Sequence, residues 1–167
     1  DISLYVSNSN TFTFDTSGNH LFLIDNSTTE IVQLPLQETF NIGSIDSPNI
    51  STQSLNTIVS GNIVDHSFAP TGQTLHLLID NGSLVQIDDI SPVFDVNNIV
   101  NSTITTFTLS NLYPATALTW FNGGDNLLVS YISEAYVKRL EQFVVSQAYD
   151  FDSHEYSVDL DIRPITV

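Results

Sequence analysis

The stretch Phe14–Asn41, FDTSGNHLFLIDNSTTEIVQLPLQETFN, decides the fold because the chain repeats it. It returns over Phe68–Asp95 as FAPTGQTLHLLIDNGSLVQIDDISPVFD, and it returns more loosely over Trp120–Asp150. Each copy has an aromatic residue, three residues, a glycine, two further residues and then a short apolar run. The glycines of the three copies, which lie 54 and 52 residues apart, are Gly18, Gly72 and Gly124.

The spacing of the copies and the pattern inside them predict an all-β fold. Repeats near fifty residues that are built from strand-like pieces are typical of the blades of a β-propeller. We therefore expect a single repeat array over residues 1–167, a propeller-like set of about three four-stranded antiparallel blades that is incomplete as a closed propeller. The predicted blades are 8–60, 61–112 and 113–163, and an extra N-terminal strand lies within 1–7.

The predicted strands are apolar runs bounded by polar turn clusters. In the first blade they are Thr11–Phe14, Leu21–Ile24, Ile31–Leu36 and, as the outer strand, Leu55–Val59. In the second blade they are Ile63–Phe68, Leu75–Ile79, Leu84–Ile87 and Ile104–Leu109. The third blade begins with Leu118–Phe121, and alternating apolar residues predict terminal strands at Ile2–Val6 and Val158–Ile162. The pair Asn81-Gly82 between two apolar runs predicts a type I′ hairpin turn.

Equivalent positions in the three copies are expected to have equivalent environments. Three glycines follow polar turn residues and should have positive φ, namely Gly18, Gly72 and Gly124. Six apolar residues should be buried at matching positions, namely Leu21, Leu23, Leu75, Leu77, Leu127 and Val129. The segment Ser133–Ala148 has apolar residues at helical spacing. The repeat instead makes Val137–Leu140 the third strand of its blade, and we follow the repeat because tertiary context overrides local period in short segments.

The composition bounds the class of protein. Apolar residues make up 41% of the chain, which is ordinary for a folded domain, so the net charge of −16 does not indicate disorder. No run of eighteen apolar residues and no basic-then-apolar leader occur, and no methionine is present, so we expect a processed chain or a piece of a longer one without membrane insertion. The absence of cysteine excludes disulfides, a thiolate nucleophile and metal ligation by sulfur.

The acidity is unevenly distributed along the chain. Residues 1–137 contain no lysine or arginine and thirteen carboxylates, and the three cations are Lys138, Arg139 and Arg163. Such a surface repels phosphate backbones and anionic lipid, so nucleic acid and membrane surfaces are disfavoured as partners. The acidity is explained by solubility, with steering of a cationic partner as the alternative. Fifteen asparagines and thirty-seven serines and threonines are consistent with an extracellular, cell-surface or virion protein.

The repeats resemble a family of β-propeller repeats found in bacterial surface proteins and in phage tail or fibre proteins. The family pattern reads F-S-P-D-G-T-K-x-Y-V-x-G and then V-Y-Q-Y-x-L-S-x-x-W-D-V-S. Phe68–Leu75 is similar to the first half, and Ile31–Leu36 followed by Phe40-Asn41-Ile42 is similar to the second. In the third repeat Lys138-Arg139 replaces the valine-glutamine core, and the proline-aspartate turn is intact in no repeat. The resemblance implies a fold and no catalytic set.

Clusters of polar residues supply few candidate sites. The four histidines show no HExxH motif or paired spacing and are interpreted as structural or surface residues, namely His20, His66, His76 and His154. Aspartate clusters offer oxygen ligands to calcium but form no twelve-residue calcium loop, namely Asp80-Asn81, Asp88-Asp89 and Asp150–Asp152. The turn Thr13–Gly18 resembles the Asp-box of sialidase propellers, with one residue too many and no tryptophan. Candidate glycosylation sites are Asn26, Asn49, Asn81 and Asn101, a number expected by chance, with Asn26 and Asn81 predicted on exposed hairpin tips.

No catalytic, cofactor-binding or metal residue is predicted, and calcium is kept only as an alternative. We expect a non-catalytic structural or binding module of an extracellular or virion surface assembly, with other copies, other subunits, a protein receptor or a glycan as partners. The first alternative is a self-polymerising filament subunit that exchanges a terminal strand. A propeller-type glycosidase or lyase is the second alternative. Because closed propellers have about four to eight blades, the chain is not expected to be a self-sufficient monomer.

Overall fold

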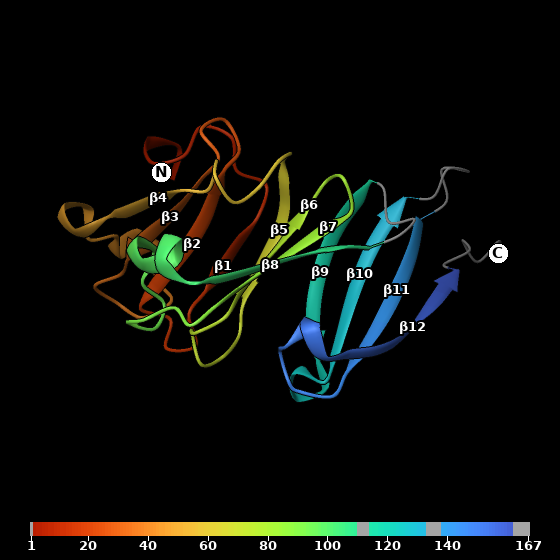
Figure 1. Ribbon diagram of the computed structural model, residues 1–167. Coiled ribbons are helices and arrows are strands. Elements are labelled where there is room, and N and C mark those ends of the chain that lie inside the picture. The colour runs from red at the N-terminus through yellow and green to blue at the C-terminus, as the bar shows by residue number, and fades with distance from the viewer. Residues whose placement is uncertain (1, 110–113, 133–137, 162–167) are drawn as a thin grey trace, which may run out of the picture.

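The computed structural model describes residues 2–109, 114–132 and 138–161, and only the backbone at 156 and 159–161 (Figure 1). It contains three four-stranded antiparallel sheets in which each strand pairs with the next strand of the chain. We call them blades 1, 2 and 3. Among the described residues no sheet closes on itself, which confirms the predicted propeller-like array.

The strands of each blade follow the chain order. Blade 1 has β1 Phe12–Phe14, β2 His20–Asp25, β3 Glu30–Pro35 and β4 Ser51–Ser54. Blade 2 has β5 Ile63–Phe68, β6 Leu75–Ile79, β7 Ser83–Asp88 and β8 Thr103–Thr108. Blade 3 has β9 Ala115–Phe121, β10 Asn126–Ile132, β11 Lys138–Val145 and β12 His154–Asp161. Short 3-10 helices punctuate the loops, namely η1 Ile2–Leu4, η2 Ile42–Ser44, η3 Ser47–Asn49, η4 Val96–Asn101, η5 Asn122–Gly124 and η6 Phe151–Ser153.

The blades form an open fan, with blade 1 at one end and blade 3 at the other (Figure 1). The first strands of successive blades contact one another, β1 against β5 and β5 against β9. Two apolar cores fill the spaces between blades, one with residues of blades 1 and 2 and one with residues of blades 2 and 3. Each blade therefore has a leading face toward the preceding blade and a trailing face toward the next one.

The middle strand of blade 2 is a continuous apolar run because blades 1 and 3 cover its two faces. In blade 1, strand β2 is covered by blade 2 on one face and by residues such as Val6 and Ile45 on the other. All five residues of β6 are buried, and so are the last five of β2. The six apolar residues predicted at matching positions are all buried, at 3% exposure or less. The pairing Phe14 with Leu21 recurs as Phe68 with Leu75 and as Trp120 with Leu127. This register confirms the predicted equivalence.

The turn glycines have positive φ, as predicted: 71° at Gly18, 73° at Gly72 and 95° at Gly124. A Cβ at Gly18 would lie 2.5 Å from the ring of Phe40, so a side chain has no room there. The backbone N–H of Phe40 donates to the carbonyl of Gly18 at 2.8 Å, and Phe40 itself has a φ of 58°. Phe94 packs on Gly72 and Tyr149 on Gly124 in the same way, so a glycine–aromatic contact closes every blade.

The outer strand of blade 1 is β4, Ser51–Ser54, and the prediction of Leu55–Val59 as this strand is wrong. Leu55 is fully buried, and Ile58 and Val59 pack against the core between blades 1 and 2. Their apolar character reflects burial in the linker between two blades. Strand β4 reads Ser-Thr-Gln-Ser and is half exposed, so it carries no apolar pattern.

The predicted N-terminal strand Ile2–Val6 is also wrong, because Ile2–Leu4 is the 3-10 helix η1. The N–H groups of Tyr5 and Val6 both donate to the carbonyl of Ile2. The N–H groups of Ile58 and Val59 donate to the carbonyl of Leu55 in the same pattern. Val6 is buried against the leading face of blade 1, so 2–6 has the form of the linker between blades.

The third strand of blade 3 confirms one prediction and corrects another. Residues 138–145 form strand β11, in agreement with the repeat, while 133–137 lie outside the described residues. The register of β11 against β10 makes Glu141-Gln142-Phe143, and not the neighbourhood of Lys138-Arg139, the equivalent of Val32-Gln33-Leu34 and Val85-Gln86-Ile87.

The hairpin at Asn81-Gly82 is not a type I′ turn. Gly82 has a φ of 79°, but Asn81 is not among the residues with positive φ. The N–H of Gly82 donates to the carbonyl of Ile79 at 3.0 Å. A three-residue loop with a type I turn and a left-handed glycine accounts for this geometry.

Candidate functional site

Two buried glutamines join successive blades. The Oε1 of Gln33 on β3 accepts the N–H of Val96, the first residue of η4, at 3.3 Å. The Oε1 of Gln86 on β7 accepts the N–H of Phe151, the first residue of η6, at 2.7 Å. We call this contact the glutamine latch: a glutamine on the trailing face of one blade and a 3-10 turn on the leading face of the next.

The turn presents its N–H to the latch because of its cap. The carboxylate of Asp95 accepts the N–H of Asn97, and that of Asp150 accepts the N–H of Asp152. The first N–H of a 3-10 or α-helix has no partner within the helix, so it is free to donate outward. Asn41 caps η2 in the same way, by accepting the N–H of Gly43. All three blades thus carry the donor half of a latch.

The leading face of blade 1 lies open at one end of the fan. Ile42, the first residue of η2, is 57% exposed, whereas its equivalents Val96 and Phe151 are at most 1% exposed. Phe12 is 66% exposed, whereas the residues at its register position, His66 and Leu118, are buried. A third apolar residue of this face is exposed too, the glycine-packing Phe40. The part of this face formed by β1 and η2 is therefore apolar and accessible. Its centre, on β2 and β3, is already buried beneath Tyr5, Val6, Ile45 and Ile50.

The trailing face of blade 3 lies open at the other end. Gln142 pairs with Leu128 in the register that places Gln33 opposite Phe22 and Gln86 opposite His76. Gln142 is half-buried, and its Nε2 donates to Asn126 at 2.8 Å. The other half-buried residues of this face are Leu128, Ser130, Ile132, Leu140 and Val144. Blade 3 thus carries the acceptor half of a latch.

Substitution of the inner latch residue should destabilise the fold. Gln86→Ala removes the acceptor for the buried N–H of Phe151, and a buried donor left unpaired costs about 1–3 kcal/mol. Gln142→Ala is the matched control, because it removes the same side chain from an open face. We expect urea denaturation, at a concentration at which the chain is monomeric, to show the loss for Gln86→Ala and less than about 1 kcal/mol for Gln142→Ala. Equal effects would contradict the latch.

The four histidines do not converge. His20 donates from Nδ1 to Asp15 at 2.8 Å, and His154 stacks on Phe151 with ring centroids 4.8 Å apart. His66 and His76 are buried in blade 2, where each has an Nε2 without a hydrogen-bond partner. Within the described part of the chain no three His, Asp or Glu side chains are grouped so that they could hold a metal ion.

Burial lowers the pKa of both inner histidines to about 4, although Asp65 near His66 and Asp88 near His76 oppose the shift. His76 stands where blade 1 has Phe22, and it packs against the next blade: the Nε1–H of Trp120 donates to its Nδ1 at 3.2 Å. Both imidazoles therefore act as neutral core groups near pH 7.

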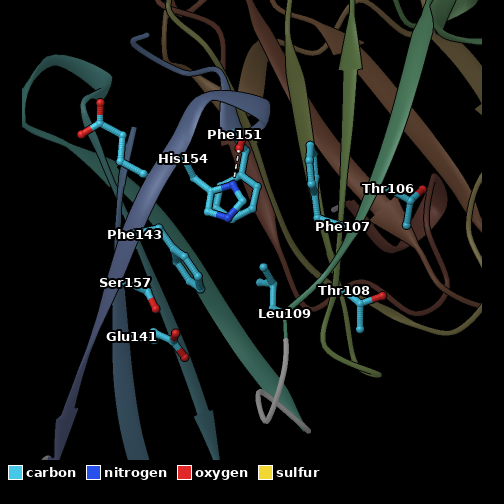
Figure 2. A pocket seen from close by; sticks show the side chains of 10 residues that line it. Thr106, Phe107, Thr108, Leu109, Glu141, Phe143, Phe151, His154 and Ser157 are labelled. Carbon is cyan, nitrogen blue, oxygen red and sulfur yellow. Dashed lines mark hydrogen bonds between the residues drawn. The ribbon is translucent and has the colours of Figure 1, made fainter. Parts of the chain in front are cut away.

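A groove of about 520 Å³ lies between β8 and blade 3 (Figure 2). Its floor is aromatic, because Phe151 packs edge-on against Phe107 and Phe143 with centroids 4.9 and 5.1 Å apart. Glu141 and His154 also line it. Glu141 stands where the other blades have valine, and His154 where they have isoleucine. The sequence analysis missed this site, and the signal that marks it is this departure from the repeat.

A second groove, of about 420 Å³, brings together several aspartates of the predicted clusters, namely Asp88, Asp89, Asp150 and Asp152. Asp88 accepts hydrogen bonds from Thr74 and Gln86, both at 2.8 Å. Asp150 caps η6 and accepts from Gln86 at 3.1 Å. Two of these aspartates are thus engaged in turns and in the latch. Asp80 lies at the other end of β7 and binds Asn62.

The four candidate glycosylation sites lie on separate loops. Asn49, Asn81 and Asn101 are exposed. Asn26 is half-buried: its Nδ2 donates to the carbonyl of Ile63 and its Oδ1 accepts the N–H of Ile63, each at 2.9 Å. This pair of hydrogen bonds joins blade 1 to blade 2, so the expectation of an exposed hairpin tip is wrong for Asn26.

The turn Thr13–Gly18 is a compact polar loop. Asp15 accepts hydrogen bonds from His20, Ser17 and the N–H of Asn19. Burial would raise the pKa of Asp15, but these hydrogen bonds lower it below its usual value. The aspartate thus fixes the turn before β2 and has a structural role.

Comparisons with known proteins relate the chain to others by fold alone. No family model and no curated protein matches the sequence. Solved structures do match: a candidate 6-phosphogluconolactonase from Bacteroides fragilis has a TM-score of 0.60 and 13% identity over 93% of the chain and 40% of that protein. The β-propeller domain of Myceliophteria thermophila Cps50 (Swd1) has a TM-score of 0.54 and 11% identity over 90% of the chain and 42% of that domain. The sheets are β-propeller blades.

The luciferin-regenerating enzyme is another structural neighbour, with a TM-score of 0.57 and 14% identity over 75% of the chain and 38% of that enzyme. The chain thus spans about two fifths of the length of these structures. Among the helices described, none is long and apolar enough to cross a membrane.

Proposed function

We propose that the chain is a non-catalytic structural or binding module that assembles with other propeller blades through its two open faces. One observation carries the proposal: Phe12, Phe40 and Ile42 are more than half exposed, at 66%, 58% and 57%. The residues that match Phe12 and Ile42 in the other blades are buried by the preceding blade. On the leading face of blade 1, residue types that are buried between the other blades are therefore exposed to solvent.

The energetic reason is the exposure of large apolar side chains. Burying one such side chain contributes about 1.5–3 kcal/mol, and soluble proteins rarely leave a contiguous patch of them uncovered. Phe40 has a role inside the blade, because its ring packs on Gly18 and Phe14. A polar residue in place of the exposed Ile42 or Phe12 would reduce the exposed apolar surface. The retention of apolar residues at both positions therefore favours a face that is covered in the working assembly.

The setting that fits this module is extracellular, on a cell surface or a virion. Support comes from composition: fifteen asparagines and thirty-seven serines and threonines accompany three lysines and arginines. The acidic surface disfavours nucleic acid and anionic membranes as partners. We expect a protein or glycan receptor to bind in the aromatic groove of Figure 2, because rings such as Phe107 offer flat apolar contacts.

The names of the structural neighbours do not carry an enzymatic function to this chain. A phosphorylated lactone needs cationic or N–H-rich partners for its phosphate. Residues 1–137 have no lysine or arginine. Lys138 and Arg139 line a smaller pocket of about 330 Å³ on blade 3, and neither lines the aromatic groove or the aspartate-lined groove. Both grooves have carboxylates on their walls, which repel such a substrate.

The structure gives less support to the strand-exchange filament than the sequence alone did. That hypothesis used two terminal strands, one to finish blade 3 and one to pair with a neighbour. Blade 3 is finished by β12, and 2–6 is a linker-like turn packed on blade 1. Assembly through blade faces needs no exchanged strand.

The proposal predicts concentration-dependent association of the isolated chain. Sedimentation velocity at micromolar concentration should show species larger than 18.4 kDa, and added salt should favour them because it screens the net charge of −16. Hydroxyl-radical footprinting should show Phe12 and Phe40 protected in the associated species. A monomer at every concentration, with both rings reactive, would contradict the proposed function.

A further inference from the structure

The leading face of blade 1 retains each element of the two internal interfaces. Its turn η2 is capped by Asn41 as η4 and η6 are capped by Asp95 and Asp150. The N–H of Ile42, the first residue of that turn, therefore occupies the place of the latch donor. The linker-like segment 2–6 packs on this face, as Ile58 and Val59 pack in the core between blades 1 and 2.

The trailing face of blade 3 retains the complementary elements. Gln142 occupies the register position of the latch acceptors Gln33 and Gln86. Leu128 occupies the position of Phe22 and His76, which pack against the first-strand aromatic residue of the next blade with centroids 4.6 and 4.9 Å apart. The equivalent aromatic residue of blade 1 is Phe14.

The two ends of the fan thus match each other as the internal blade faces do. Resting on the proposed function, we propose that the partner at each open face is a second copy of this chain, docked head to tail. The N–H of Ile42 in one copy donates to the Oε1 of Gln142 in the other, and Phe14 packs on Leu128. The interface between copies continues the interfaces between blades 1, 2 and 3.

Pairing of like faces does not satisfy these groups. Two leading faces would bring together two N–H donors at Ile42 with no acceptor. Two trailing faces would bring together two glutamines and leave no 3-10 turn to receive them. Only the head-to-tail (heterologous) arrangement pairs the N–H of Ile42 with Gln142 and packs Phe14 against an apolar residue, Leu128.

The head-to-tail contact closes a ring when the rotation per blade permits it, and otherwise it continues as a filament. Two copies bring six blades, which lies within the range of about four to eight that closed propellers use. In a closed pair the two contacts are identical by two-fold symmetry and no blade edge stays open. We therefore infer a two-copy, six-bladed propeller.

Thiol cross-linking tests the order of the faces. The chain has no cysteine, so Ile42→Cys and Gln142→Cys each introduce a single thiol. A short bis-maleimide should join the two variants when they are mixed and should join neither variant to itself. The matched control replaces Ile42→Cys by Val100→Cys, a residue that is 46% exposed on η4 of blade 2. That mixture should give no product.

Each other outcome overturns the inference. Cross-linking of Ile42→Cys with itself would show like faces paired. Association without the mixed product would overturn head-to-tail docking and leave the proposed function standing, whereas a monomer at all concentrations would overturn both. The variant that carries both Ile42→Cys and Gln142→Cys should give only a cross-linked dimer. A ladder of larger cross-linked oligomers would show a filament and overturn the ring.

A second variant makes the test independent of labelling. Ile42→Asp places a charge on the open face and should weaken self-association by at least about tenfold, as loss of a buried interface anchor does. Val100→Asp, at a residue that is 46% exposed and lies off the open faces, should leave the association constant unchanged. Because Ile42 is mostly solvent-exposed in the single chain, circular dichroism and the urea midpoint should be the same for both variants when they are measured at a concentration at which both are monomeric. Equal association constants for the two variants would overturn the inference.

Discussion

Leu77→Ala should lower the free energy of unfolding by about 2–5 kcal/mol, the range for removing a fully buried leucine. Leu77 lies in the centre of β6, is 0% exposed and belongs to the core between blades 1 and 2. Strands pair on both sides of it, with His66 opposite on β5 and Val85 opposite on β7. Because both sheet edges and both faces are occupied, the surroundings have little freedom to collapse into the cavity.

The measurement is urea denaturation followed by tryptophan fluorescence, since Trp120 lies in the neighbouring blade. Leu4→Ala is the control, because Leu4 is 78% exposed and its truncation should change the free energy by less than about 0.5 kcal/mol. If Leu77→Ala matched this control, β6 would not be the covered middle strand that the repeat requires.

The inner half of each blade was predictable because burial and the backbone impose the same residues three times. A strand covered on both faces must be apolar, which produces the runs around Leu21 and Leu75. In β10 only the leading face is covered, and it holds Leu127 and Val129 in the same register. A ring packed on a left-handed turn excludes a side chain, which produces the recurring glycine. These constraints are local, so a single sequence displays them at a fixed period.

The predicted strands Ile104–Leu109 and Val158–Ile162 overlap β8 and β12, so the outer strands of blades 2 and 3 were predictable. The outer strand of blade 1 was not, because that exposed strand carries no apolar signal. Ser51–Ser54 pairs with β3 through its backbone, and nothing in Ser-Thr-Gln-Ser requires a strand. Strands were predicted instead at the apolar segments Leu55–Val59 and Ile2–Val6, but each of these segments is a turn packed against a blade. Apolar character reports burial, and burial occurs in linkers as well as in strands.

The latch escaped prediction because its two halves are far apart in sequence. Gln33 and Gln86 were visible as repeated residues, but their partners, Val96 and Phe151, follow 63 and 65 residues later. The third glutamine was hidden by register, since Lys138-Arg139 occupies the expected spacing and Gln142 the actual one. Strand pairing was needed to align the three copies.

Acidification should destabilise the chain between pH 6.5 and 4 through the two buried histidines. Burial holds the pKa of His66 and of His76 at about 4 in the folded chain, whereas the unfolded value is 6.5. Protons therefore bind the unfolded chain first. The free energy of unfolding should be level above pH 6.5, fall by about 1.4 kcal/mol per pH unit for each histidine, and level again below pH 4. The total is roughly 3 kcal/mol for each histidine.

Asp25 acts in a lower window and is separable from this effect. Burial would raise its pKa, but hydrogen bonds from Ser27 and Ser7 lower it to about 2, so its contribution is lost only as the pH falls from 3.8 toward 2. Relief of repulsion among carboxylates works in the opposite direction, since protonation reduces the net charge of −16. The histidine effect must therefore be read as a difference between variants.

The repeat itself supplies those variants. Blade 3 has Leu118 at the position of His66 and Leu128 at the position of His76, so His66→Leu and His76→Leu introduce residues that this fold already uses there. His76→Leu also removes the acceptor for the Nε1–H of Trp120, which costs stability equally at every pH. The slope of unfolding free energy against pH between 6.5 and 4 is thus the quantity to compare. Each single variant should lose half of the histidine contribution to this slope, and the double variant should lose nearly all of it. An unchanged slope would show that both histidines gain protons without penalty and are not held in the core as described.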